Sequence, residues 1–324
     1  MALELTEVQS ITDDFWFPVS GPQWTEGNVL GYKLLEKAEV VGSSEYMRAP
    51  LVYAKSRGGP MGATTEFNVA KKRTIAAARY PWARFWAGAT IDIDDMTEIS
   101  GGDQEIDYVM TQLDNAQATI RAYVAESIWT LRSAMVTTYG AEVDPLYGIP
   151  DLMLQSNTSP AYGRINYADL GTDDRGRYIW LAFEDATPLV MQFSTMQTLR
   201  SGCRVGNDNA EKPDLYVTTD TLYNAFEETL HNQVRRYDEA LAKAGFENIL
   251  FGSAAVVADD RCTAGSVNAF RMNDWKVQIH EKYNFKPPVW KEPVNQEVKT
   301  CQIILTIRIG VTQRRSQGHL TVVT

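Results

Sequence analysis

The feature that most constrains this chain is a basic, glycine-interrupted segment inside an acidic protein. Residues 48–84 hold eight basic side chains and one acidic side chain, Glu66, so the segment carries a net charge of +7. The whole chain carries −10, which leaves −17 for the remainder. A segment with such a contrasting charge is suited to contact an acidic surface. Another copy of the same protein offers that surface in quantity.

The pattern of this segment predicts a long hairpin. Residues 45–53 favour an extended strand, 56–65 are a turn-rich tip, and extended structure is expected again at 66–69 and before Trp86. A two-stranded hairpin is marginal in water, so this one is expected to rest on a partner surface. Two other interpretations are an ordinary solvated loop and a platform for single-stranded nucleic acid. The side chains predicted to contact a neighbouring subunit are Arg48, Lys55, Arg57, Lys71, Lys72, Arg73 and Arg79.

Composition limits the class of protein. The chain has 324 residues and 44% hydrophobic residues, enough for two domains or one large one with a real core. A sequence pI of about 4.9 argues against bulk binding of nucleic acid, which depends on Lys and Arg. The three cysteines form no CxxC pair, which is typical of a reducing compartment. No apolar run is long enough for a membrane span and no secretory signal is visible, so we expect a cytosolic origin.

The first 44 residues are predicted to form an N-terminal arm. They mix aromatic side chains with proline and glycine, and no helix or strand period persists. Such a segment cannot bury its aromatic rings alone, so we expect it to lie along the body of the protein or along a neighbour. The side chains expected to pack in this way are Phe15, Trp16, Phe17 and Trp24.

The clearest predicted element is a long helix. Apolar residues recur at steps of three and four from Ile106 to Met135, which predicts a helix that begins near Asp103 and ends before Gly140. About 34 residues at a rise of 1.5 Å each give a rod of about 50 Å. This length exceeds that of the usual helix. It suits either a long core helix or a spine for two domains.

The second half of the chain mixes short helices with strands. Thr187-Pro188 predicts the start of a helix that ends near Gly202, and Asp220 predicts the start of another. Strands are expected at 213–218, 249–257, 267–279 and 302–311, with a bend or tight hairpin at Gly252. These patterns together predict the α+β class.

Motifs for catalysis or cofactor binding are missing from the sequence. His231, His280 and His319 do not have metal-ligand spacing, and there is no phosphate-binding glycine motif and no nucleophile elbow. We therefore predict no catalytic, cofactor-binding or metal-ligating residues. The alternative is a carboxylate-dependent metal enzyme, because Asp92 and Asp94 would share one face of a strand and could hold a cation.

Five stretches, in order, resemble segments of the tailed-phage major capsid proteins of the HK97-like fold. They are YGIPDL (147–152), RINYAD (164–169) with the residues up to Trp180, PDLYVTTDTLY (213–223), FENILFGSAAVVAD (246–259) and NAFRMN (268–273). In the fourth stretch Ala255 replaces the usual proline. The resemblance extends over most of residues 45–320.

The resemblance implies a division of the chain into five parts. These are an N-terminal arm (1–44), an extended loop (45–85), a peripheral domain with a spine helix (86–147), an axial domain (148–265) and strands that return to the peripheral domain (266–324). The basic hairpin would be the extended loop that lies over a neighbouring subunit. The long helix from Asp103 would be the spine.

The resemblance also implies a structural function and no enzymatic activity. The chain would be the major capsid protein of a double-stranded DNA phage, assembling in the bacterial cytoplasm into hexamers and pentamers of an icosahedral virion head. Portal, separate scaffold and decoration proteins are expected partners, packaged DNA would be near only through weak non-specific contact, and no membrane is involved. An encapsulin-type compartment shell is the alternative with the same fold.

Overall fold

The computed structural model describes residues 28–42, 44–62, 70–92, 102–154, 161–172, 176–204, 212–230, 242, 248–286, 289–294 and 298–323. The chain divides into two compact units. Unit 1 comprises residues 1–45, 82–148 and 277–309, and unit 2 comprises 46–81, 149–276 and 310–324. Each unit is therefore built from three separate stretches of the chain, and neither can form until distant segments have met.

Unit 1 contains a four-stranded sheet with the order β1-β10-β11-β4. Strand β1 pairs in parallel with β10, and β11 runs antiparallel to β4 along the full length of β4. Buried and exposed side chains alternate strictly along β4, as expected for a strand with one covered face. The strands are β1 (Ala38–Val41), β10 (Trp275–His280), β11 (Val298–Val311) and β4 (Ala83–Asp92).

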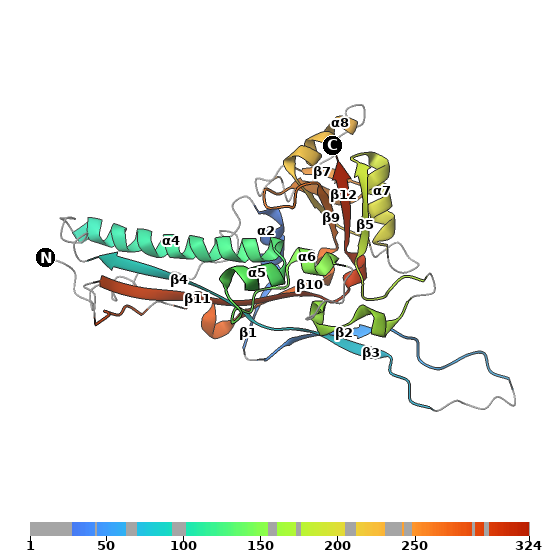
Figure 1. Cartoon of the computed structure of the whole chain (residues 1–324), viewed down its shortest axis with the longest axis horizontal. Helices are drawn as coiled ribbons and strands as arrows, with labels where there is room; N and C mark the ends of the chain where they lie inside the picture. Colours follow the sequence, from blue (N-terminus) through green and yellow to red (C-terminus); the bar gives the residue numbers. More distant parts are fainter. Residues whose placement is uncertain are drawn as a thin grey trace. The chain divides into compact units, whose positions relative to one another are not determined.

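Helix α4 (Gly102–Trp129) lies along β4 (Figure 1). Its apolar face is fully buried at Val109, Leu113 and Ile120, in agreement with the three- and four-residue periodicity of the sequence. A short helix, α2 (Val29–Leu35), also belongs to unit 1 and is capped by Asn28, whose Oδ1 accepts a hydrogen bond of 2.7 Å from the Gly31 amide.

The prediction of one helix up to Gly140 is wrong in its second part. Helix α4 ends at Trp129, and a separate helix, α5 (Arg132–Tyr139), follows after an extended residue, Leu131. Gly148 gives the physical reason, because a Cβ on it would lie 2.3 Å from the carbonyl oxygen of Thr130. The returning chain therefore passes directly against the end of α4.

Unit 2 contains a six-stranded mixed sheet with the order β5-β12-β9-β6-β8-β7. Strands β12 and β5 are parallel, as are β6 and β8, whereas β12 and β9, β6 and β9, and β7 and β8 are antiparallel. Strands β9 and β12, from the segment 266–324, thus lie in this sheet, whereas most of β10 and β11 lies in unit 1. The bounds are β5 (Phe183–Val190), β12 (Gly318–Val323), β9 (Ser266–Phe270), β6 (Leu215–Thr218), β8 (Ala254–Ala258) and β7 (Asn248–Phe251).

Two helices, α7 (Phe193–Gly202) and α8 (Asp220–Thr229), share one core with this sheet. Phe251 on β7 is central to the core. Its ring contacts Phe193 of α7 at 5.1 Å between centroids, Tyr216 of β6 at 5.8 Å and Phe226 of α8 at 6.1 Å. The tight turn at Gly252 between β7 and β8 confirms a local prediction. A helix also starts at Asp220 as predicted, but Asp220 is its first residue and Thr219 occupies the N-cap position that the sequence assigned to Asp220.

The predicted helix start at Thr187-Pro188 is wrong. Residues 183–190 form strand β5, in which Leu189 and Val190 pair with β12, and the helix begins only at Phe193. Pairing with a distant strand outweighs a local capping signal here. The predicted strand 267–279 is also two strands, β9 and β10, separated by a single 3₁₀ turn, η4 (Met272–Asp274).

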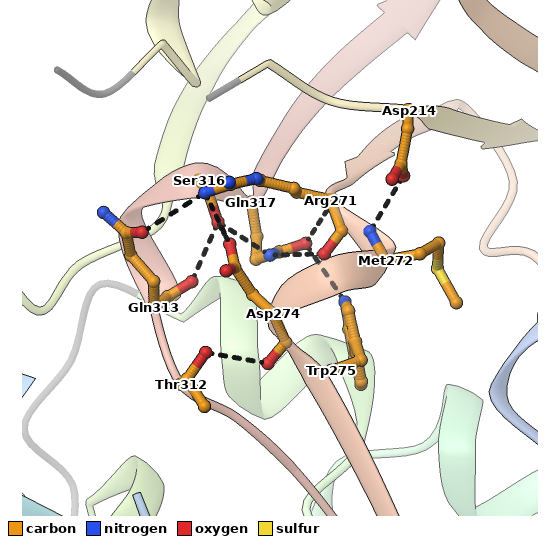
Figure 2. A network of polar contacts seen from close by, with 9 residues as sticks. All are labelled: Asp214, Arg271, Met272, Asp274, Trp275, Thr312, Gln313, Ser316 and Gln317. Carbon is orange, nitrogen blue, oxygen red and sulfur yellow. Dashed lines mark hydrogen bonds and ion pairs between the residues drawn. The ribbon is translucent and has the colours of Figure 1, made fainter. Parts of the chain in front are cut away.

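A buried polar network closes the end of the sheet in unit 2 (Figure 2). Asp274 accepts a hydrogen bond from Ser316 Oγ, and its carboxylate lies 3.5 Å from Arg271 Nη1. Gln317 Oε1 accepts from the Arg271 amide at 3.0 Å and from Trp275 Nε1 at 3.2 Å. These polar groups satisfy one another, which suits a structural role in joining β9 to the chain before β12.

Candidate inter-subunit surface

The basic segment contains a two-stranded antiparallel sheet within unit 2. Strands β2 (Met47–Val52) and β3 (Ile75–Tyr80) pair from Met47↔Tyr80 to Val52↔Ile75, and the Tyr53 amide donates to the Thr74 carbonyl at 3.0 Å. This confirms the strand predicted at 45–53. The returning strand predicted at 66–69 lies outside the described residues.

Tyr80 anchors one face of the hairpin in unit 2. Its hydroxyl donates a hydrogen bond of 2.7 Å to the Val311 carbonyl, and its ring contacts Tyr162 edge-on at 5.6 Å. A Cβ on Gly310 would lie 2.4 Å from the Tyr80 ring, so only glycine leaves room for it. The end of β3, where the hairpin returns, is thereby joined to the end of β11.

A 3₁₀ turn, η2 (Tyr162–Arg164), supports the same face. Gly163 has φ +63°, and a Cβ there would lie 2.9 Å from the Cβ of Ala78. Arg164 lies over the Tyr46 ring at 4.8 Å from its centroid, and Trp180 Nε1 donates to the Tyr162 carbonyl at 3.2 Å. The base of the hairpin therefore packs on its own subunit.

The opposite face of the hairpin points to solvent. Along it the cross-strand pairs are Arg48↔Arg79, Pro50↔Ala77 and Val52↔Ile75. Val52 is 70% exposed and Ile75 is 64% exposed, although both are large apolar residues. Like charges directly opposite each other destabilise an antiparallel pair. This outward face thus combines an unfavourable pair of cations with large apolar side chains that are exposed to water.

All seven basic side chains predicted to contact a neighbour are exposed. The described parts of the segment, 48–62 and 70–84, contain eight basic residues and no acidic residue. Within the described part of the chain, neither Arg48 nor Arg79 forms a hydrogen bond or an ion pair through its side chain. Lys72 Nζ donates to the Lys55 carbonyl at 3.0 Å, which links the two sides of the hairpin beyond the strands.

The predicted arm residues Phe15, Trp16, Phe17 and Trp24 lie outside the described residues, which begin at Asn28. Their contacts therefore stay a prediction.

A buried arginine in unit 1 joins the two chain segments that flank the hairpin. Arg308 is 1% exposed and donates to the Ser44 carbonyl at 3.1 Å, to Ser44 Oγ at 2.6 Å and to Gln278 Oε1 at 2.9 Å. Trp82 Nε1 donates to the same carbonyl at 2.7 Å. Burial lowers the pKa of Arg308 to about 10, which leaves it charged at neutral pH. Sequence reasoning missed this cluster.

The remaining candidates for chemistry give no assembled site. Asp92 is exposed at the end of β4, and Asp94 lies outside the described residues. The His280 ring packs against Trp82 in a tilted arrangement, with 5.2 Å between ring centroids, His319 contacts Asn268, and His231 lies outside the described residues. Among the residues that the structure describes, no group of three or more His, Cys, Asp or Glu could hold a metal ion. No helix within these ranges is long and apolar enough to cross a membrane.

Comparisons with known proteins place the fold. No family model matches the chain, and no curated protein matches it. Among solved structures, the cyanophage A-1(L) capsid matches with a TM-score of 0.63 at 13% identity, over 93% of this chain and 94% of that chain. The capsid of a native GTA particle matches with a TM-score of 0.57 at 10% identity, over 90% of both chains.

The chain has the HK97-like capsid fold. This α+β fold is the one that the ordered sequence stretches predicted. The SrpI encapsulin of Synechococcus elongatus also matches, with a TM-score of 0.50 at 8% identity, over 87% of this chain and 83% of that chain. At such low identities the likeness to the HK97-like fold is one of architecture, and it extends over nearly the whole chain.

Proposed function

We propose that the chain is the major capsid protein of a double-stranded DNA tailed phage and assembles into an icosahedral head. The observation that carries the proposal is the hairpin surface. The chain has a fold that is found in capsids, and its hairpin segment exposes basic side chains. The described residues of this segment include eight basic residues and no acidic residue, while the rest of the chain carries a net charge of −17. Such a surface is complementary to a second copy.

The apolar side chains of the hairpin support self-association more than charge does. Exposed ion pairs are each worth only about 0–1 kcal/mol. Val52, Met61 and Ile75 are 70%, 70% and 64% exposed, and burying such side chains contributes about 1.5–3 kcal/mol each. Charge would therefore direct the hairpin onto an acidic neighbour, and apolar burial would hold it there. Many such contacts in one closed shell add up to high stability.

The proposal assigns a role in the capsid to each of these parts of the chain. The hairpin is the extended loop, α4 is the spine helix, and the six-stranded sheet of unit 2 belongs to the axial domain. The subunits form hexamers and pentamers, with portal, separate scaffold and decoration proteins as partners. Double-stranded DNA would be enclosed without tight binding, because the chain is net acidic. The location would be the virion head, after assembly in the bacterial cytoplasm.

The second candidate function is an encapsulin-type shell, which the match to SrpI supports. The long basic hairpin favours the phage capsid. The contents of particles purified from the native source decide between the two: double-stranded DNA supports the capsid, and an enclosed enzyme supports the compartment.

A metal enzyme is the alternative from another class. Its support is the sequence Asp92-Ile93-Asp94-Asp95, in which only Asp92 is described. A thermal shift with a divalent cation that disappears in Asp92→Asn would favour it. The capsid proposal predicts no such shift.

The proposal is tested by expressing the chain alone and examining it by negative-stain electron microscopy. Closed shells or capsomers of uniform size are expected. Stable monomers at every concentration, with the hairpin protected by its own subunit in hydrogen exchange, would contradict the proposal.

A further inference from the structure

A second cationic feature lies in unit 2, beside the C-terminal end of α7. A pocket of about 330 Å³ is lined by three basic and two neutral polar side chains: Gln197, Arg200, Ser201, Arg204 and Lys212. None of the described residues that line it is acidic, and all three basic residues are half-buried. No described residue of the hairpin lines this pocket.

Arg200 is held in place by its surroundings. Its guanidinium lies over the ring of Phe251, 5.9 Å from the centroid. Gly252, at the turn between β7 and β8, has φ +71°, and a Cβ there would lie 2.5 Å from Arg200 Nη1. The glycine therefore serves two purposes, since it permits the turn and leaves room for the guanidinium. The arginine is positioned before any ligand arrives, which lowers the entropic cost of binding.

The three cations lack counter-ions in the described part of the chain. Arg200, Arg204 and Lys212 form no ion pair with any residue that the structure describes. Withdrawing charged groups from water is unfavourable unless they are paired. Two guanidinium groups and one ammonium around an open pocket provide the donors that recognise an oxyanion, either a carboxylate or a phosphate.

We propose that this pocket binds a carboxylate side chain of a second copy of the chain. The inference rests on the proposed self-assembly. Each copy carries 41 acidic residues against 31 basic ones, so carboxylates are the abundant oxyanions on a neighbour. The same net charge of −10 repels nucleic acid. Exposed acids are also present in unit 2 itself, for example Asp220, Glu228 and Asp260, as a head-to-tail contact between like units in a ring requires.

The first test compares self-association of three forms of the full chain by sedimentation velocity. The variant Arg200→Gln/Arg204→Gln/Lys212→Gln removes the three charges of the pocket. The control Lys276→Gln/Lys282→Gln/Lys286→Gln removes three charges from exposed lysines elsewhere. We expect the pocket variant to associate about tenfold more weakly at low salt and to lose part of the salt dependence, while the control resembles the wild type.

The second test identifies the partner group. A carbodiimide joins the Lys212 amine to a carboxylate in direct contact, with loss of one water molecule. Copies labelled with heavy isotopes are mixed with unlabelled copies, and the linked peptides are analysed by mass spectrometry. We expect Lys212 to be linked to an acidic residue of the other isotopic form, and Arg200→Gln/Arg204→Gln to reduce the yield.

The outcomes separate this inference from the proposed function. If the wild type forms shells, the pocket variant associates equally well and Lys212 is linked only within its own copy, the inference is overturned and the capsid proposal stands. If the pocket variant instead loses binding to a fluorescent DNA duplex with unchanged association, the ligand is phosphate and the inference is also overturned. A wild type that never self-associates contradicts both proposals.

Discussion

Arg308 donates two hydrogen bonds to Ser44, although the two residues are 264 positions apart in the sequence. The guanidinium also lies 3.9 Å from the centroid of the Trp82 ring. Ser44 and Trp82 flank the stretch 46–81 that holds the hairpin, and both belong to unit 1. One buried side chain thus fixes the point where the chain leaves for the hairpin and the point where it returns.

Replacing Arg308 is expected to destabilise unit 1. Arg308→Ala leaves Ser44 Oγ and Gln278 Oε1 without the arginine donor, leaves the Ser44 carbonyl with Trp82 Nε1 alone, and exposes one face of Trp82. The free energy of unfolding should therefore fall by about 2–4 kcal/mol. Arg308→Lys keeps the charge but not the planar fork, so it should recover only part of the loss. Urea unfolding measures both. Arg84→Ala, at an exposed position on β4, is the control and should change stability by less than about 0.5 kcal/mol. An Arg308→Ala protein as stable as this control would contradict the assignment.

The contact between Gly310 and Tyr80 gives a second stability prediction. Gly310→Ala places a methyl group against the Tyr80 ring and should cost about 1–3 kcal/mol from overpacking. Tyr80→Phe keeps the ring but removes the hydrogen bond to the Val311 carbonyl, with an expected loss of about 0.5–1.5 kcal/mol. Gly58→Ala is the matched control, because a Cβ there meets nothing within 4 Å. Equal melting temperatures for Gly310→Ala and Gly58→Ala would show that the site tolerates a methyl group.

These two contacts also mark the limit of sequence-based prediction for this fold. The start of α8 at Asp220 and the turn at Gly252 were predictable, because capping and turn signals lie within a few residues. The basic surface was predictable from charge alone. Arg308–Ser44 and Tyr80–Gly310 were not, because each joins segments more than two hundred residues apart.

The wrong predictions have the same physical origin. Thr187-Pro188 carries a valid local signal for a helix start, but strand β5, residues 183–190, pairs with β12. Pairing in a sheet satisfies the backbone hydrogen-bonding groups as well as a helix would, so the local signal does not decide the structure. The apolar periodicity continues through Leu131, yet α4 stops because the chain at Gly148 packs against its last turn. In both places contacts with a distant part of the chain, and not the local sequence preference, determine the secondary structure.

Shortening the hairpin should separate folding from assembly. The Tyr53 amide and the Thr74 carbonyl are hydrogen-bonded, so residues 54–73 can be replaced by the two-residue turn Asn-Gly without disturbing β2 or β3. The shortened chain should keep the circular dichroism spectrum and melting temperature of the wild type within a few degrees, but it should form no closed shells by electron microscopy. Normal shells from this chain would contradict the role of the distal hairpin.

Reversing charge near the hairpin tip should weaken assembly. Lys71→Glu/Lys72→Glu/Arg73→Glu changes the local charge by six units at exposed positions, which turns attraction to an acidic neighbour into repulsion. Light scattering should show assembly that is blocked or delayed at low salt and partly restored as salt screens the repulsion. Lys276→Glu/Lys282→Glu/Lys286→Glu changes total charge equally away from the hairpin and should have a smaller effect. Identical kinetics for the two variants would argue against a specific basic surface.

The cross-strand pair Arg48↔Arg79 allows a test in which stability and assembly move in opposite directions. Arg79→Glu replaces a like-charge pair with an opposite-charge pair, so the isolated subunit should gain about 0.2–1 kcal/mol of stability. The same change removes a cation from the outward face and should reduce assembly. Arg79→Gln removes the repulsion without adding attraction, and both effects should be intermediate. A surface that serves only folding would improve with Arg79→Glu in every assay, so a more stable subunit that assembles normally would refute the inter-subunit role of this arginine.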